Sequence, residues 1–175
     1  MFSATQLAQK YLRYYLSASN GKGHGIHSPF VFEFIKSVLN DKKHYPCYVQ
    51  IESLRNQLLK DRNVIEVEDF GAGSSVIKSN KRIVRDMAAS SLKPKKFSQL
   101  LYRMVQKYQP AAIVELGTSF GITTAYLANA NPTAKVYTLE GAASIASIAQ
   151  HHFNSLGIKS IELIPGDFDD SLPAL

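Results

Sequence analysis

Two short segments of the chain combine an acidic side chain with closely spaced glycines, a pattern typical of loops that bind nucleotides. The first is EDFGAGSSV, residues 68–76, and the second is VELGTSFGI, residues 114–122. A nucleoside cofactor needs a close approach of the backbone after one strand, which glycine allows. It also needs a carboxylate about 20 residues later, at the tip of the next strand, to accept hydrogen bonds from the ribose hydroxyls.

The second segment is followed by residues that meet these requirements. Gly117 and Gly121 come after the apolar run AAIVEL, and Glu140 lies 23 residues after Gly117, at the end of a second apolar run, AKVYTLE. A third run, SIELIP, leads to Asp167, whose carboxylate is suited to accept a hydrogen bond from the exocyclic amine of an adenine ring. We therefore predict that the cofactor loop lies at residues 114–122.

The first segment lacks this continuation, because no second strand with a terminal acid follows Gly73. It also does not fit a kinase DFG motif, since no glycine-rich loop, strand lysine or HRD-type segment precedes it. We interpret residues 71–73 as a tight turn whose glycines supply positive φ angles. Asp69 is placed near the substrate as a hypothesis.

The residues around the second loop also indicate which nucleoside cofactor fits. A dinucleotide fingerprint that begins at Gly117 requires glycines where the chain has Ser119 and Ile122. Glu115 precedes the turn, and a carboxylate there would repel a pyrophosphate but attract the cationic amino-acid end of S-adenosylmethionine. These residues favour S-adenosylmethionine over a nicotinamide dinucleotide.

The elements that position these residues alternate along the second half of the chain. Apolar runs at 111–116, 134–140 and 160–165 predict buried strands, and the segments between them predict helices. This β-α-β-α-β alternation predicts an α/β fold with a parallel sheet and right-handed crossovers. Ligands of such sheets lie at the carboxyl ends of the strands, where the candidate residues are found.

The first half of the chain predicts a helical front piece without a self-standing core. The segment NVIEVEDF, residues 63–70, predicts a short strand or extended arm at best. Helical periodicity and capping residues predict helices over residues 4–18, 29–40, 50–60, 80–91 and 96–108. We divide the chain into an N-terminal cover segment, 1–90, and the N-terminal half of a cofactor-binding domain, 91–175.

Residues 90–175 resemble the class I S-adenosylmethionine-dependent methyltransferases, in the branch of small-molecule O-methyltransferases of the catechol O-methyltransferase kind. The resemblance lies in the ordered motifs ELGTSFG, TLE and GDF. It implies a Rossmann-like parallel sheet, of which the chain contains the first three strands in the order 3-2-1, and S-adenosylmethionine as cofactor. The cofactor-binding residues that it implies are Glu115, Gly117, Thr118, Ser119, Gly121, Glu140, Gly141, Asp167 and Phe168.

The resemblance also implies a role for each of these residues. The loop from Glu115 to Gly121 would surround the methionine part of the cofactor, and Glu140 would bind the ribose hydroxyls, with Gly141 beside it. Asp167 and Phe168 would flank the adenine, and residues 91–96 would cross over the cofactor. The implied reaction is methyl transfer to a hydroxyl of a small molecule, which depends on in-line positioning and, where needed, deprotonation of the acceptor.

The chain departs from the family pattern in its number of strands. The family sheet has seven strands in the order 3-2-1-4-5-7-6, and this sequence stops shortly after the third. We expect a truncated product, inactive by itself, whose strand at 111–116 offers an open edge for homo-oligomer formation. The catalytic residues are unknown: the candidates are Asp69 and, in GHGIHSPFVF, which resembles the front piece of some bacterial members, His24 and His27. No metal site is predicted.

Charge and composition narrow the remaining function classes. Residues 1–110 carry 18 Lys and Arg against 8 Asp and Glu, whereas residues 111–175 carry 2 against 6. The basic residues are scattered, which favours a solvated surface over a nucleic-acid partner, although an RNA methyltransferase remains an alternative. A second alternative is a non-catalytic cofactor-binding or assembly module that associates through the open sheet edge.

Cysteine content and hydropathy indicate where the protein is located. Cys47 is the only cysteine, and the sequence has no run of 18 apolar residues and no signal-peptide pattern. We therefore expect a cytoplasmic protein without a membrane partner.

Overall fold

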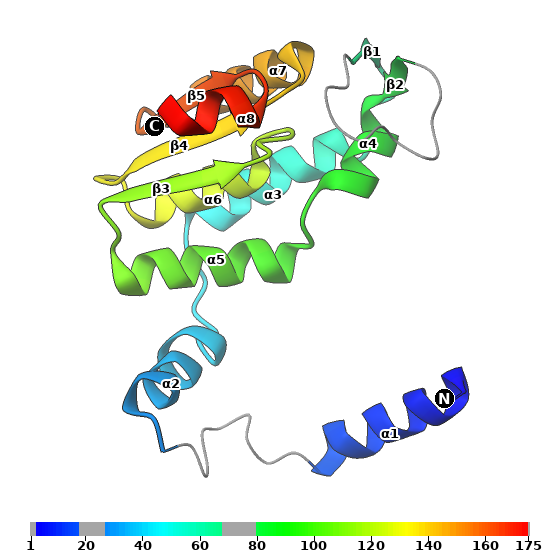
Figure 1. Ribbon diagram of the computed structural model, residues 1–175, viewed down its shortest axis with the longest axis vertical. Coiled ribbons are helices and arrows are strands. Elements are labelled where there is room, and N and C mark those ends of the chain that lie inside the picture. Colours follow the sequence, from blue (N-terminus) through cyan, green and yellow to red (C-terminus); the bar gives the residue numbers. More distant parts are fainter. Residues whose placement is uncertain (1–2, 18–26, 68–79, 175) are drawn as a thin grey trace. The chain divides into compact units, whose positions relative to one another are not determined.

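The computed structural model describes residues 3–17, 27–67 and 80–174. Contacts between residues divide the chain into two compact units, Met1–Lys43 and His44–Leu175. All the strands that the structure describes belong to the second unit (Figure 1).

The first unit contains helices only, in the part of it that the structure describes. They are α1 (Ala4–Ser17), α2 (Pro29–Phe34) and the π-helical turn η2 (Ile35–Leu39). Ser28 caps α2, because its Oγ accepts a hydrogen bond from the Val31 amide, and Pro29 fills the first helical position, where no backbone N–H is needed. The predicted helix start at Ser28–Pro29 is confirmed.

The second unit is built on a three-stranded parallel sheet. Its strands are β3 (Ala112–Leu116), β4 (Lys135–Glu140) and β5 (Ile161–Pro165), in the order β3-β4-β5. This order is the predicted 3-2-1 arrangement of the first three strands, so the α/β fold class is confirmed. A separate antiparallel pair, β1 (Val64–Glu66) and β2 (Lys81–Ile83), contains the short strand predicted within residues 63–70.

Helices connect the strands and cover one face of the sheet. The helices of this unit are α3 (Cys47–Leu58), α4 (Val84–Ser91), α5 (Lys95–Tyr108), α6 (Ile122–Ala130), α7 (Ala143–Ser155), α8 (Phe168–Ser171) and the 3₁₀ turn η3 (Leu172–Ala174). The crossover helix α6 joins β3 to β4, and α7 joins β4 to β5 (Figure 1). Most residues of α6 are buried, in agreement with its small and apolar side chains and its lack of charged residues.

The hydrophobic core lies where α6 meets α3, α4 and α5. Tyr48 and Ile51 of α3, Met87 of α4 and Tyr102 of α5 belong to one cluster with Tyr126 of α6. The helix α3 therefore packs into the same core as the sheet-connecting helices, and the contacts divide the chain at Lys43–His44. The division into a cover segment 1–90 and a cofactor-binding segment 91–175 stays a prediction.

Gly121 begins α6 at a position that only glycine fits. Its φ angle is 79°, in the left-handed region that other residues rarely adopt. A Cβ atom there would lie 2.5 Å from the Phe153 ring and 3.4 Å from Ala149, both on α7. The glycine thus permits close packing of the α6 N-terminus against α7, immediately after the loop that leaves β3.

Candidate functional site

The predicted glycine loop, Gly117–Gly121, lies at the carboxyl end of β3 and is fixed to the tip of β4. The amides of Gly117 and Thr118 both donate to the Leu139 carbonyl, at 3.0 Å each. Gly117 and Ser119 have positive φ angles of 90° and 49°, so the loop turns sharply between the strand and α6. The sequence-predicted loop and the β4 tip are therefore neighbours, as the spacing of the motifs indicated.

Glu140 connects this loop to the start of α7. Its Oε2 accepts a hydrogen bond of 2.7 Å from the Ser119 amide, and its Oε1 accepts one of 3.2 Å from the Ala142 amide. A carboxylate has about four lone-pair sites, so two remain for further donors such as hydroxyls. Gly141 lies between Glu140 and Ala142 in the sequence.

Glu115 points to the helix-covered side of the sheet and joins three elements. Its Oε2 accepts hydrogen bonds from the hydroxyls of Thr124 on α6 and Thr138 on β4. The Thr138 hydroxyl also lies 2.7 Å from that of Thr118 in the loop. Burial raises the pKa of Glu115, and the two threonine hydroxyls and the Lys93 ammonium partly offset this increase.

The third strand brings Asp167 and Phe168 to the same end of the sheet. The Gly166 amide donates to the Glu140 carbonyl at 3.0 Å, so the end of β5 lies beside the tip of β4. Asp167 caps α8, because its Oδ1 accepts a hydrogen bond from the Asp169 amide, and Phe168 is the first residue of that helix. The predicted residues thus follow three adjacent strand ends.

A cavity of about 540 Å³ lies along β3, between the glycine loop and α5. Its wall includes Glu115, Gly117, Thr118 and Ser119 from the predicted set. Its polar lining also includes Ser91, Lys93 and Thr123, and its apolar lining Leu101, Met104, Val114, Leu116 and Ile122. The other predicted residues, from Gly121 and from the ends of β4 and β5, do not line this cavity.

The end of α4 and the segment between α4 and α5 line part of the cavity. The hydroxyls of Ser91, the last residue of α4, and Ser119 lie 3.0 Å apart, so the end of α4 contacts the glycine loop directly. Lys93 lines the cavity and acts electrostatically on Glu115. Residues 91–96 are expected from the sequence to cross over the cofactor, but neither of these two contacts is predictable from it.

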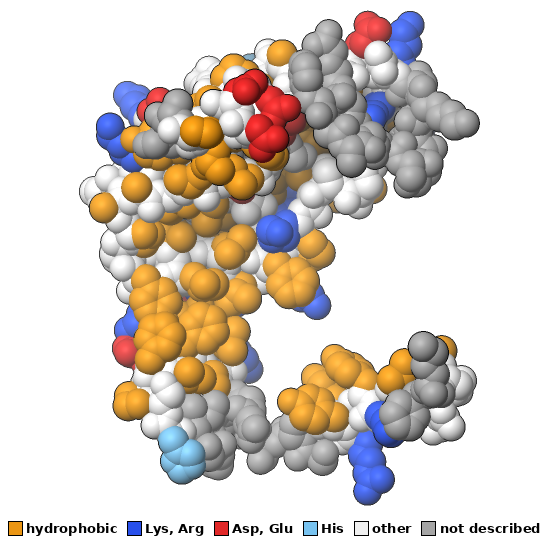
Figure 2. All heavy atoms as spheres, viewed as in Figure 1, with side chains coloured by type: hydrophobic (Ala, Val, Ile, Leu, Met, Phe, Trp, Pro, Cys, Tyr) orange, Lys and Arg blue, Asp and Glu red, His pale blue; other side chains and the backbone are white. Residues whose placement is uncertain are grey.

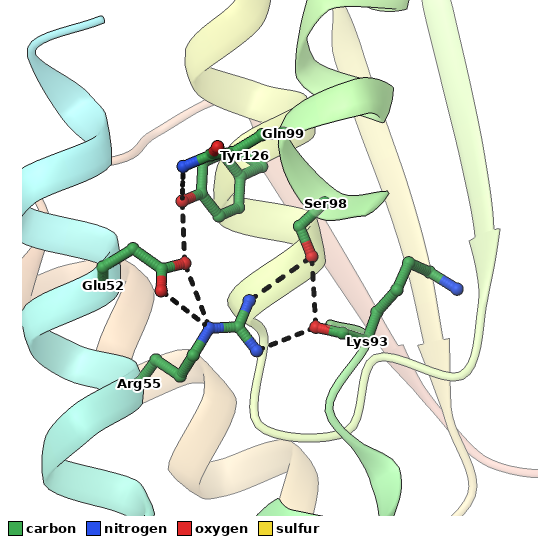
Figure 3. A network of polar contacts seen from close by, with 6 residues as sticks. All are labelled: Glu52, Arg55, Lys93, Ser98, Gln99 and Tyr126. Carbon is green, nitrogen blue, oxygen red and sulfur yellow. Dashed lines mark hydrogen bonds and ion pairs between the residues drawn. The ribbon is translucent and has the colours of Figure 1, made fainter. Parts of the chain in front are cut away.

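A buried polar network holds this segment in place (Figure 3). Arg55 of α3, which is only 7% exposed, donates from Nη1 to the Lys93 carbonyl at 2.8 Å and pairs through Nε with Glu52 at 3.0 Å. Glu52 in turn accepts a hydrogen bond of 2.8 Å from the Tyr126 hydroxyl. The Lys93 side chain extends away from the Arg55 guanidinium, so the network binds the backbone of the segment and leaves the ammonium group outside it.

The network also includes Ser98 and Gln99 at the start of α5. The burial of Arg55 is not predicted from the sequence, because an arginine in an amphipathic helix ordinarily faces water and nothing in its spacing indicates burial. A sequence signal does exist in the Glu52–Arg55 spacing of three residues, which allows an ion pair on one helix turn.

The remaining candidates are not brought to this site by the described structure. His24 and Asp69 lie outside the described residues. His27 is described and is exposed, in the first unit. Within residues 3–17, 27–67 and 80–174, no group of three or more His, Cys, Asp or Glu side chains is arranged to hold a metal ion.

Part of the chain is similar in sequence to curated proteins named as O-methyltransferases. No protein-family profile matches the chain. Over 80 residues it is 34% identical to the human protein named transmembrane O-methyltransferase and 32% identical to the rat transmembrane O-methyltransferase homolog. These alignments cover 44% of the chain and 28% and 31% of the two relatives, so the chain spans less than a third of the length of the curated relatives that it matches.

A solved structure shows the same fold. The whole chain aligns with 56% of the SAH-bound Podospora anserina methyltransferase PaMTH1, with a TM-score of 0.55 and 12% sequence identity. The resemblance to class I O-methyltransferases is confirmed. The structure therefore has the Rossmann-like methyltransferase fold. The glycine loop follows β3, and Glu140 is the last residue of β4.

The expected cytoplasmic location is contradicted by these relatives, because they are named as transmembrane proteins. Absence of a long apolar run in the sequence was therefore insufficient to assign a compartment. In the part of the chain that the structure describes, no helix is long and apolar enough to cross a bilayer.

Proposed function

We propose that this chain binds S-adenosylmethionine and contributes to the transfer of its methyl group to a hydroxyl of a small molecule. The observation that carries the proposal is the placement of Glu140, a carboxylate bonded to the Ser119 amide of the glycine loop at the end of the adjacent parallel strand. The similarity to proteins named O-methyltransferases supports the reaction class.

The described residues suit the three parts of this cofactor. The loop from Gly117 to Gly121, with Glu115 behind it, takes the methionine part, and Glu140 accepts hydrogen bonds from the ribose hydroxyls beside Gly141. Asp167 and Phe168 take the adenine, the former as an acceptor and the latter as an apolar contact. Lys93 lines the cavity next to the loop, where its ammonium group suits the carboxylate of the cofactor's amino-acid end.

When bound, S-adenosylmethionine would supply a methyl group made electrophilic by the positive charge on its sulfur. The protein's part is to hold the acceptor oxygen in line and to accept the hydroxyl proton. His24, His27 and Asp69 stay candidates for the group that receives this proton. The acceptor itself is proposed only as a small molecule with a hydroxyl.

Calorimetric titration of the chain with S-adenosylhomocysteine, the product form of the cofactor, tests the proposal. We expect saturable one-to-one binding that Glu140→Ala weakens by at least tenfold, because the substitution removes the carboxylate that accepts charge-assisted hydrogen bonds from the ribose hydroxyls. Glu162→Ala is the matched control, since Glu162 is an exposed carboxylate on the neighbouring strand β5. Absence of binding, or equal weakening by both substitutions, would reject the cofactor site.

A second candidate function, association through the sheet, is favoured by the exposure of β3. Val114 and Leu116 are 51% and 54% exposed, although both belong to the apolar sequence of the edge strand β3. We propose that a second copy of the chain covers these side chains. Light scattering tests this, because Val114→Lys should convert a dimer to a monomer, and a wild-type protein that is monomeric at high concentration overturns the proposal.

A further inference from the structure

The first helix of the chain has two chemically different faces. At 3.6 residues per turn, Leu7, Tyr11, Leu12, Tyr14 and Tyr15 fall within one arc of about 160°. Gln6, Gln9, Lys10 and Arg13 occupy the opposite side. In Figure 2 hydrophobic side chains gather along one flank of this helix and a basic side chain projects from the other.

The apolar face of α1 is exposed along its whole length. Its large side chains are between 54% and 70% exposed, from Leu7 to Tyr15, and every residue from Ala4 to Leu16 is classed as exposed. A helix of 14 residues is marginally stable in water by itself, and most helices are stabilised by packing of their apolar face. A surface that buries this face would therefore also stabilise the helix.

The charge of this region restricts what the covering surface is. The first 32 residues contain Lys10, Arg13 and Lys22 and no aspartate or glutamate, since the first acidic residue is Glu33. A negatively charged surface would attract the basic residues of this region. An apolar layer beneath that charge would bury the apolar face of α1. The surface of a membrane with anionic lipids has both properties.

The composition of the apolar face also suits a membrane surface better than a protein core. Three of its five large residues are tyrosines, whose rings prefer the boundary between hydrocarbon and water because the hydroxyl stays hydrated. The helix is about 21 Å long, shorter than the hydrocarbon core of about 30 Å, so it fits in the plane of the interface and not across it.

We propose that α1 is an interfacial helix that docks the protein on membranes containing anionic lipids. Leu7, Tyr11 and Tyr15 enter the boundary between headgroups and acyl chains, and Lys10 and Arg13 contact the lipid phosphates and carboxylates. A docked helix places the rest of the chain next to the bilayer. The proposal does not depend on methyl transfer, because neither the glycine loop nor Glu140 takes part in it.

Co-sedimentation of the full chain with lipid vesicles tests the proposal. We expect binding to phosphatidylcholine vesicles that contain about 30% phosphatidylserine, and binding at least tenfold weaker to pure phosphatidylcholine. The double variant Lys10→Glu, Arg13→Glu should lose about 30-fold or more in partitioning, from two basic charges near the surface. The variant Tyr11→Ser, Tyr15→Ser should also lose binding, through the apolar face.

The matched control is Lys60→Glu, Lys159→Glu, which changes the net charge equally at two exposed lysines outside α1. It should retain vesicle binding within about twofold, and thermal melts should show that all variants are folded. Equal binding to both kinds of vesicle, or equal loss in both charge variants, overturns the proposal. The proposal is also overturned if the protein does not bind vesicles and instead forms a dimer. If Tyr11→Ser, Tyr15→Ser dissociates that dimer, a second copy of the chain covers the helix.

Discussion

The Ser119 amide donates a 2.7 Å hydrogen bond to Oε2 of Glu140, across two adjacent strand ends. Glu140→Ala removes this bond and the bond from the Ala142 amide. Both amides then lose the carboxylate oxygen that accepts their hydrogen bonds. We expect the free energy of unfolding to fall by about 1–2 kcal/mol. Urea denaturation measures this loss. Glu162→Ala should change stability by less than about 0.5 kcal/mol, and a similar loss there would contradict the assigned role.

Arg55→Ala should be strongly destabilising, because it leaves the partly buried Glu52 carboxylate without its ion-pair partner and the Lys93 carbonyl without its donor. We expect a loss of about 3 kcal/mol in the free energy of unfolding, measured with urea. Glu52→Gln combined with Arg55→Met removes both charges and should recover part of the loss. The exposed Arg62→Ala is the control. If Arg55→Ala and Arg62→Ala behave alike, the network does not stabilise the segment.

Gly121→Ala and Gly157→Ala separate steric conflict from backbone strain. Both glycines have positive φ angles, 79° and 68°, but a Cβ on Gly121 meets Phe153 at 2.5 Å, whereas nothing lies within 4 Å of a Cβ on Gly157. Gly157→Ala should cost about 1 kcal/mol of stability from strain alone, and Gly121→Ala should cost at least about 2 kcal/mol. Thermal denaturation compares the two. Equal costs would show that α7 moves away without penalty.

Glu115 should make stability depend on pH. Burial raises the pKa of its carboxyl above the ordinary 4.5, so the folded state holds a proton that the unfolded state releases as pH rises from that value. The contribution of Glu115 to stability is therefore greatest below pH 4.5 and declines as pH increases through the folded-state pKa. Glu115→Gln removes this dependence. Unfolding by urea between pH 4 and pH 8 should show the variant gaining on the wild type with increasing pH, and a constant difference would contradict the raised pKa.

The sheet and the loop were predictable from sequence, whereas the core beneath them was not. Continuous apolar runs such as AAIVEL and the acid at each strand end identify the parallel strands directly, because both depend on local spacing. The expected burial of β3 is wrong, because Val114 and Leu116 are more than half exposed. The burial of α3 depends on tertiary contacts of Tyr48 and Ile51 with α6, which periodicity does not reveal. Residues 81–83, expected to be helical, form β2 because they pair with Val64–Glu66. That pairing is a tertiary effect that overrides local propensity.

The Thr138 hydroxyl has one proton, so it can donate only one of the two hydrogen bonds that it forms. This fixes the direction of hydrogen-bond donation between Thr118, Thr138 and Glu115. When Glu115 is ionised, Thr138 gives its proton to Oε2 of Glu115, so its own oxygen is left to accept from Thr118. Hydrogen-bond donation then runs one way, from the glycine loop through β4 to the carboxylate on β3. The orientation of the Thr118 hydroxyl, at the edge of the cavity, is thereby coupled to the charge of a side chain on a different strand.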